Sequence, residues 1–200
     1  MPSNELDTQV SNLMVAELIG SFERYCKDRE EVRSLYPWAD RFVMGLPLAP
    51  WQRPAVWSAD KQQRFIVSMW AGIDLGTYMV NRKSKFLKNG SLCYLSDAVV
   101  DGQQRLLSIQ KYLLNKIAVP DVEGTLRHWK DLGKVQRRRF FSIGFACSQI
   151  HSLDETDNTE VVIDKNRLVV TYSVGNLRCK CTMKPTNVLF VPEYEFTLIN

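Results

Sequence analysis

The sequence predicts an α+β fold with a long N-terminal helix and a β-rich C-terminal part, and three observations predict it. Apolar residues recur at three- and four-residue steps up to about Arg33, a strand-turn-helix pattern occupies residues 98–117, and beyond Phe140 apolar residues cluster or alternate as in strands. Of the 200 residues, 45% are hydrophobic and 24% are charged. These values are ordinary for a folded globular domain, so a collagen-like or disordered chain is excluded.

The first predicted element is a long amphipathic helix over residues 3–33, within an N-terminal segment of residues 1–36. Its predicted buried face consists of Leu6, Val10, Leu13, Met14, Leu18, Phe22 and Tyr25. Acidic side chains outnumber basic ones along this helix, which makes it a poor place for a nucleic acid. We therefore expect it to pack on the body of the protein or on a second copy in a homodimer.

The remaining residues, 37–200, are predicted to form one domain that begins with a proline-rich loop. Prolines between residues 36 and 57 exclude a continuous helix, because proline and the residue before it are both restricted in conformation. A short helix over residues 58–71 follows, with Ser58 as its N-cap. The next predicted elements are strands at residues 77–80 and 92–95.

The densest signal is the segment Asp101-Gly-Gln-Gln-Arg105, where the predicted strand 98–100 passes through a tight turn into a helix that runs to Ile117. The free N–H groups and the dipole at the start of a helix suit a phosphate group. Gly102 would let a ligand approach the backbone, Gln103 and Gln104 would offer hydrogen bonds, and Arg105 would supply a guanidinium.

Asp101 is the ambiguous member of this segment. A carboxylate beside a phosphate is repulsive unless it binds a cation such as magnesium or orients water. The alternative is structural, because Asp is a good N-cap and Arg105, four residues on, can simply pair with Asp101. Spacing alone leaves both interpretations open.

A second cluster, residues 51–57, sets a glutamine and an arginine between two tryptophans. Arg53 could reach a phosphate, and the Trp57 indole could stack on a base. The alternative is that both tryptophans, Trp51 and Trp57, anchor an irregular segment through apolar contacts while Arg53 is a hydrogen-bonding strut.

Two motifs in a fixed order carry a family resemblance: Leu46-Pro-Leu-Ala-Pro-Trp-Gln-Arg-Pro-Ala-Val-Trp57 and Val99-Val-Asp-Gly-Gln-Gln-Arg-Leu106, with a helix beginning Ser-Ala-Asp-Lys between them. They resemble the domain of unknown function 262, part of the ParB/sulfiredoxin-like superfamily. That domain forms the N-terminal half of the GmrSD modification-dependent restriction enzymes. The motif core that carries the resemblance covers about residues 45–117.

The resemblance implies a ParB/sulfiredoxin-like fold and a site that binds, and often hydrolyses, a nucleoside triphosphate, or that is nuclease-like. Carried over by position, the catalytic residues would be Asp101, Gln104 and Arg105, with Asp101 also holding magnesium. The nucleotide-binding residues would be Gln52, Arg53, Trp57, Gly102 and Gln103. Leu107 and Ser108 replace the threonines usual in the family, and residues 1–200 include no histidine-rich HNH half, so we expect that nucleotide binding can survive without DNA cleavage.

Residues 126–139 are predicted to form a basic helix. Its cations are Arg127, Lys130, Lys134, Arg137, Arg138 and Arg139, against the single acid Asp131. They could follow a nucleic-acid phosphate backbone, although a solvated face or an acidic protein partner explains them equally well. The rival function is therefore a non-catalytic interaction protein, of phage or restriction-related origin, that binds a host protein or DNA through its charged surfaces.

The β-rich part, residues 140–200, is predicted to contain a hairpin of strands 161–163 and 168–170. Cys179 and Cys181 could join Cys93 or Cys147 in a zinc site, but buried free cysteines are favoured. The two histidines, His128 and His151, are expected to be surface or capping residues. The net charge is +4 and no apolar run is long enough to span a membrane, so we expect a cytoplasmic protein without membrane contact.

Overall fold

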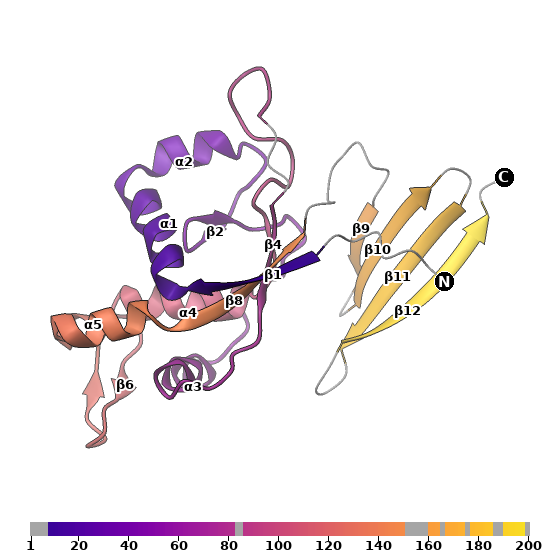
Figure 1. Ribbon diagram of the computed structural model, residues 1–200. Coiled ribbons are helices and arrows are strands. Elements are labelled where there is room, and N and C mark those ends of the chain that lie inside the picture. The colour runs from indigo at the N-terminus through magenta and orange to yellow at the C-terminus, as the bar shows by residue number, and fades with distance from the viewer. Residues whose placement is uncertain are drawn as a thin grey trace. The chain divides into compact units, whose positions relative to one another are not determined.

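The computed structural model describes most of the chain, namely residues 8–82, 86–150, 160–164, 167–174, 177–185 and 190–198. From residue 160 onward it describes the backbone only. The chain divides into two compact units, Met1–His151 and Ser152–Asn200, and Figure 1 shows the elements of each.

The predicted N-terminal helix is wrong for its first half. Strand β1 (Thr8–Met14) precedes helix α1 (Val15–Lys27), and α2 (Arg29–Leu35) follows. β1 pairs antiparallel with strand β8 (Gly144–Ile150) over its whole length, from Thr8 opposite Ile150 to Met14 opposite Gly144. This distant partner overrides the local helical periodicity, because strand formation depends on tertiary context.

Two separate helices replace the rest of the predicted long helix. The break lies at Asp28, whose backbone leaves the helical region and whose side chain accepts a hydrogen bond from the Glu31 amide at 3.0 Å, capping α2. The apolar face of α1 is buried, with Leu18 at 3% and Phe22 at 8% exposure. The expectation that this segment packs on the body of the protein is confirmed for α1.

A mixed four-stranded sheet organises the first unit in the order β1-β8-β4-β5. Its other strands are β4 (Tyr78–Asn81) and β5 (Val99–Asp101), which confirm two predicted strands. β8 runs antiparallel to β1 and parallel to β4, whereas β4 and β5 are antiparallel. β8 therefore joins the N-terminal strand to the strands that carry the predicted site.

The predicted strand at residues 92–95 is wrong. Leu92 forms only an isolated bridge with Phe86, and a turn follows in which Leu95 and Asp97 have φ values of 60° and 54°. A left-handed backbone cannot continue an extended strand. The Asp97 carboxylate instead holds the turn in place, accepting hydrogen bonds from the Tyr36 hydroxyl at 3.0 Å and from Arg82 at 3.2 Å.

Helices α3 (Ala59–Trp70) and α4 (Gln103–Leu113) pack against each other beside the sheet. α3 and its cap were both predicted correctly, since the Ser58 hydroxyl accepts a hydrogen bond from the Lys61 amide at 3.3 Å. α4 starts where the sequence predicts but ends four residues early. Two short strand pairs complete this part: β2 (Phe42–Val43) with β3 (Leu46–Pro47), and β6 (Val119–Pro120) with β7 (Leu126–Arg127).

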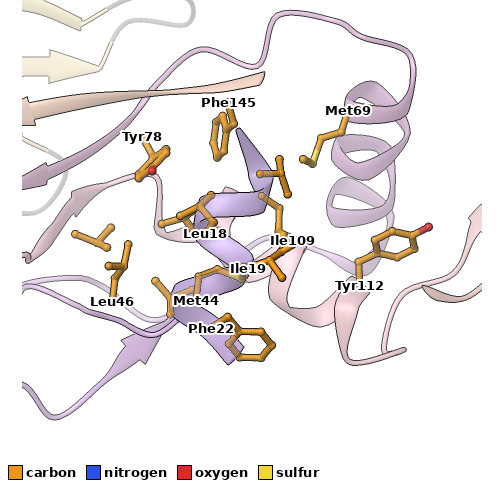
Figure 2. Close-up of a cluster of buried hydrophobic side chains, with 14 of the residues drawn as sticks. Leu18, Ile19, Phe22, Met44, Leu46, Met69, Tyr78, Ile109, Tyr112 and Phe145 are labelled. Carbon is orange, nitrogen blue, oxygen red and sulfur yellow. The ribbon is translucent and has the colours of Figure 1, made fainter. Parts of the chain in front are cut away.

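Figure 2 shows how side chains from helices and strands meet in the core of the first unit. Leu18 and Phe22 come from α1, Met69 from α3, Ile109 from α4 and Phe145 from β8. Burying one such large apolar side chain contributes about 1.5–3 kcal/mol. This cluster fixes α4, and with it the predicted turn at its N-terminus, against the sheet.

The predicted basic helix 126–139 is wrong as a single helix. Leu126–Arg127 is strand β7, Trp129–Asp131 is a 3-10 turn named η1, and only α5 (Lys134–Phe141) is helical. Gly133 interrupts the segment and becomes the N-cap of α5, where its amide donates to Gln136 Oε1 at 2.8 Å.

The second unit is an antiparallel sheet of four strands in the order β12-β11-β10-β9. Their bounds are Glu160–Asp164 (β9), Arg167–Val174 (β10), Leu177–Pro185 (β11) and Phe190–Leu198 (β12). β9 and β10 confirm the predicted hairpin, with Asp164 opposite Arg167. Among the helices of the described residues, none has the length and apolar character needed to cross a bilayer.

Candidate functional site

The turn between β5 and α4 is built around Gly102. Gly102 has a φ of +93°, which favours glycine, and it is the N-cap of α4. A Cβ at this position would lie 2.5 Å from Tyr78 Cβ and 3.0 Å from Tyr78 Cα. The close neighbour that requires a glycine is therefore the adjacent strand β4, a packing role that the sequence did not indicate.

Asp101 and Arg105 form an ion pair across this turn. Arg105 Nη2 donates to Asp101 Oδ2 at 2.8 Å, and Arg105 Nη1 donates to the Leu75 carbonyl at 3.1 Å. The Arg105 side chain is 20% exposed and that of Asp101 57%. Of the two structural alternatives for Asp101, pairing with Arg105 is confirmed, whereas capping is wrong because no side chain caps α4.

The N-terminus of α4 consequently keeps free backbone donors. The first intrahelical hydrogen bond runs from the Leu106 amide to the Gly102 carbonyl at 3.0 Å, so the N–H groups before Leu106 have no partner within the helix. Gln103, in the first turn, is buried at 8% exposure. A helix start of this kind has the donors and the dipole that an anion requires.

Gln104 and Gln52 join the two predicted motifs into one structure. Gln104 Oε1 accepts hydrogen bonds from the amides of Val56 and Trp57, both at 3.1 Å. A second hydrogen bond joins the same two motifs, because Gln52 Nε2 donates to the Val100 carbonyl in β5. The proline-rich segment therefore lies directly beside the turn, as the predicted site requires.

One polar atom of Gln104 has no hydrogen-bond partner. Its Nε2 is buried, yet no acceptor for it occurs in the part of the chain that the structure describes. An unpartnered buried donor costs about 1–3 kcal/mol, so an acceptor from a ligand would be stabilising here.

The two remaining predicted contacts, Arg53 and Trp57, differ in their surroundings. Arg53 is exposed and forms no hydrogen bond or ion pair within the described residues, so it is not the internal strut of the alternative interpretation. Trp57 is half-buried. Its ring meets Phe65 edge-on at 5.8 Å, and Lys61 Nζ lies 4.8 Å from its centroid. Lys61 is thus a cation near the site that sequence reasoning missed.

The predicted metal and cysteine sites have limited support. Among the described residues, no group of three or more His, Cys, Asp or Glu side chains is placed to hold a metal. Cys147 is buried and free, as favoured from the sequence, and burial raises the pKa of its thiol. The side chains of Cys179 and Cys181, and all of His151, lie outside the described part of the chain.

Comparison with known proteins gives one match. The family model described as the N-terminal domain of the GmrSD restriction endonuclease matches residues 44–179, which is more than half of the chain. The matched range contains both motifs and extends past the expected core into the second unit. No curated protein and no solved structure matches the chain.

Proposed function

Because the chain belongs to the family of GmrSD restriction endonuclease N-terminal domains, we propose that it binds a nucleoside triphosphate at the start of α4 and hydrolyses its phosphates. The family is restriction-related, and both nucleotide binding and hydrolysis at this turn are proposals. One observation carries the proposal: an uncapped helix start lies beside a buried Gln104 donor that has no partner. Location in the cytoplasm and assembly as a homodimer stay predictions.

The roles of the residues follow from their contacts. The amides of the first turn of α4 would bind phosphate oxygens, and Gln104 Nε2 would donate to the same ligand. Exposed Arg53 would contact the phosphates of the bound nucleotide and would also neutralise charge that develops in the transition state. Among the described residues, Arg105 uses two of its five N–H groups, so it can hold Asp101 in position and still offer donors to an anion.

A magnesium ion at this site would be shared between the Asp101 carboxylate and the phosphates of the nucleotide. Asp101 Oδ2 accepts from Arg105, which leaves Oδ1 for a metal. Mg²⁺ is commonly held by one or two carboxylates together with substrate phosphates, so a single Asp101 ligand is compatible with it. When bound, the ion would neutralise phosphate charge.

A thermal-shift and phosphate-release assay with each of the four common NTPs, with and without MgCl₂, tests the proposal. A nucleotide at a hundred times its Kd should stabilise the folded state by about 2.7 kcal/mol and raise the Tm.

Asp101→Asn should lower phosphate release by about 100-fold or more. Arg53→Ala should weaken nucleotide binding by about tenfold, through the loss of one charge-assisted contact.

α3 offers a matched control for these variants. Asp60 and Arg64 form an ion pair with the same four-residue spacing, at 2.6 Å, in which the aspartate is about as exposed as Asp101 and the arginine is far more exposed than Arg105. Asp60→Asn and Arg64→Ala should leave phosphate release unchanged. If Asp101→Asn and Asp60→Asn retained equal turnover, Asp101 would have no catalytic role and hydrolysis at this turn would be ruled out.

The Asp101–Arg105 pair favours a second candidate function. It joins the two side chains to each other, as expected if the turn is structural and the protein is a non-catalytic interaction module. In that case no nucleotide would raise the Tm of the parent protein, with or without magnesium.

A further inference from the structure

The six basic residues predicted between 126 and 139 separate into two groups. Arg127 and Arg137 are engaged within the chain. Arg127 Nε donates to Asp121 Oδ2 at 2.9 Å. Arg137 Nη2 donates to the carbonyls of Trp129 and Lys130 at 3.3 and 3.1 Å, and its guanidinium lies 5.5 Å from the Trp129 ring centroid. These two cations therefore have structural partners.

The other four residues form what we name the basic face: Lys130, Lys134, Arg138 and Arg139. All four are exposed, and none of their side chains forms a hydrogen bond or ion pair with any residue that the structure describes. Unlike Arg127 and Arg137, their side chains have no hydrogen-bonding or ion-pair partner in the part of the chain that the structure describes.

The fold places the basic face on the outer side of α5. Phe140, fully buried, marks the inner side. Lys134 and Arg138 are one turn apart and therefore neighbours, about 6 Å along the axis, whereas Arg139 lies about 100° further around the helix from Arg138. The hydrogen bond from Arg137 to the Lys130 carbonyl holds η1, and so Lys130, against the same helix.

Helix α5 itself carries no negative charge. α5 contains no acidic residue. The nearest acid in sequence, Asp131, accepts a hydrogen bond from the His128 amide at 2.9 Å through Oδ2. The exposed side of α5 also carries Val135, at 81% exposure, which is neutral. A polyanion can thus approach α5 without meeting a carboxylate on that helix.

We propose that the basic face binds the phosphate backbone of a nucleic acid. Lysine and arginine side chains a few ångströms apart match the closely and regularly spaced charges of a phosphate backbone. Contacts of this kind position a protein on nucleic acid without reading its sequence. The proposal rests on charges that lie outside the α4 turn, so it does not depend on nucleotide binding there.

Fluorescence anisotropy with a labelled 20-base-pair DNA duplex, titrated from 50 to 200 mM salt, tests this inference. Four phosphate contacts predict a slope of log K against log salt of about −3.6, or roughly a hundredfold loss of affinity over that range. The triple variant Lys134→Gln, Arg138→Gln, Arg139→Gln should reduce the size of the slope by about 2.7 and weaken binding at every salt concentration.

The control is a second triple variant with the same change in net charge: Arg24→Gln, Lys27→Gln, Lys88→Gln. These residues are also exposed, but they lie on α1 and between β4 and β5. The control should bind DNA as the parent does. Equal losses in both triple variants, no binding by the parent, or equally tight binding of poly-glutamate by the parent would overturn the proposal. The last result would indicate an acidic protein as the partner.

Discussion

Replacing Gly102 with alanine is expected to lower the free energy of unfolding by about 3 kcal/mol. Two costs add. A non-glycine residue in the left-handed region costs about 1–2 kcal/mol, and Gly102 has a φ of +93°. The new Cβ would also lie 2.5 Å from Tyr78 Cβ, and overpacking of this kind costs about 1–3 kcal/mol. Tyr78 is 1% exposed and fixed in the sheet, so it has little room to move away.

Gly72→Ala is the matched control for this measurement. Gly72 has a similar φ of +70°, but nothing lies within 4 Å of the Cβ that alanine would add. Only the backbone cost of about 1–2 kcal/mol should remain. Urea denaturation of both variants gives the two free energies. Equal losses would show that contact with Tyr78 does not determine the need for glycine at the α4 turn.

Phe140→Ala should have the largest effect of any core substitution near the basic face. Phe140 is fully buried, and its ring centroid lies 5.2 to 5.5 Å from those of Trp70, Trp129 and Tyr112. Truncating a buried phenylalanine to alanine costs about 3–5 kcal/mol, because the cavity closes only in part. The loss also removes the main anchor of α5, and calorimetry or urea denaturation should detect it.

Phe86→Ala removes the same side chain at an exposed position. Phe86 is 69% exposed, so its loss should change the free energy of unfolding by less than about 0.5 kcal/mol. A small effect of Phe140→Ala, comparable to that of Phe86→Ala, would contradict the aromatic cluster as the anchor of α5.

Sequence reasoning succeeded where local chemistry determines the structure. Ser58 followed by a helical pattern correctly predicted α3, and the Asp101-Gly102 turn ahead of periodic apolar residues correctly predicted the start of α4. It failed at residues 8–14, where an apolar pattern compatible with a helix becomes strand β1. The partner of that strand begins at Gly144, more than a hundred residues away, and no local signal reports it.

The proximity of the two motifs was predicted, but the contacts between them were not. The order of the two motifs placed Gln52 and Trp57 near the turn, and the structure brings them there. The sequence could not show that Gln104 binds the amides of Val56 and Trp57, because backbone donors carry no residue-specific signal. The sequence also could not show the packing of Tyr78 against Gly102, because this contact depends on how β4 and β5 align.

The place of β8 in the sheet has a consequence for synthesis on the ribosome. β8 separates β1 from β4, so β1 lacks its partner in this sheet until residues 144–150 have left the exit tunnel. Contacts between such distant segments also slow folding. While synthesis has not yet passed residue 144, β1 and β4 would therefore each carry a strand edge without their shared partner, and a chaperone that shields such edges would act at this stage.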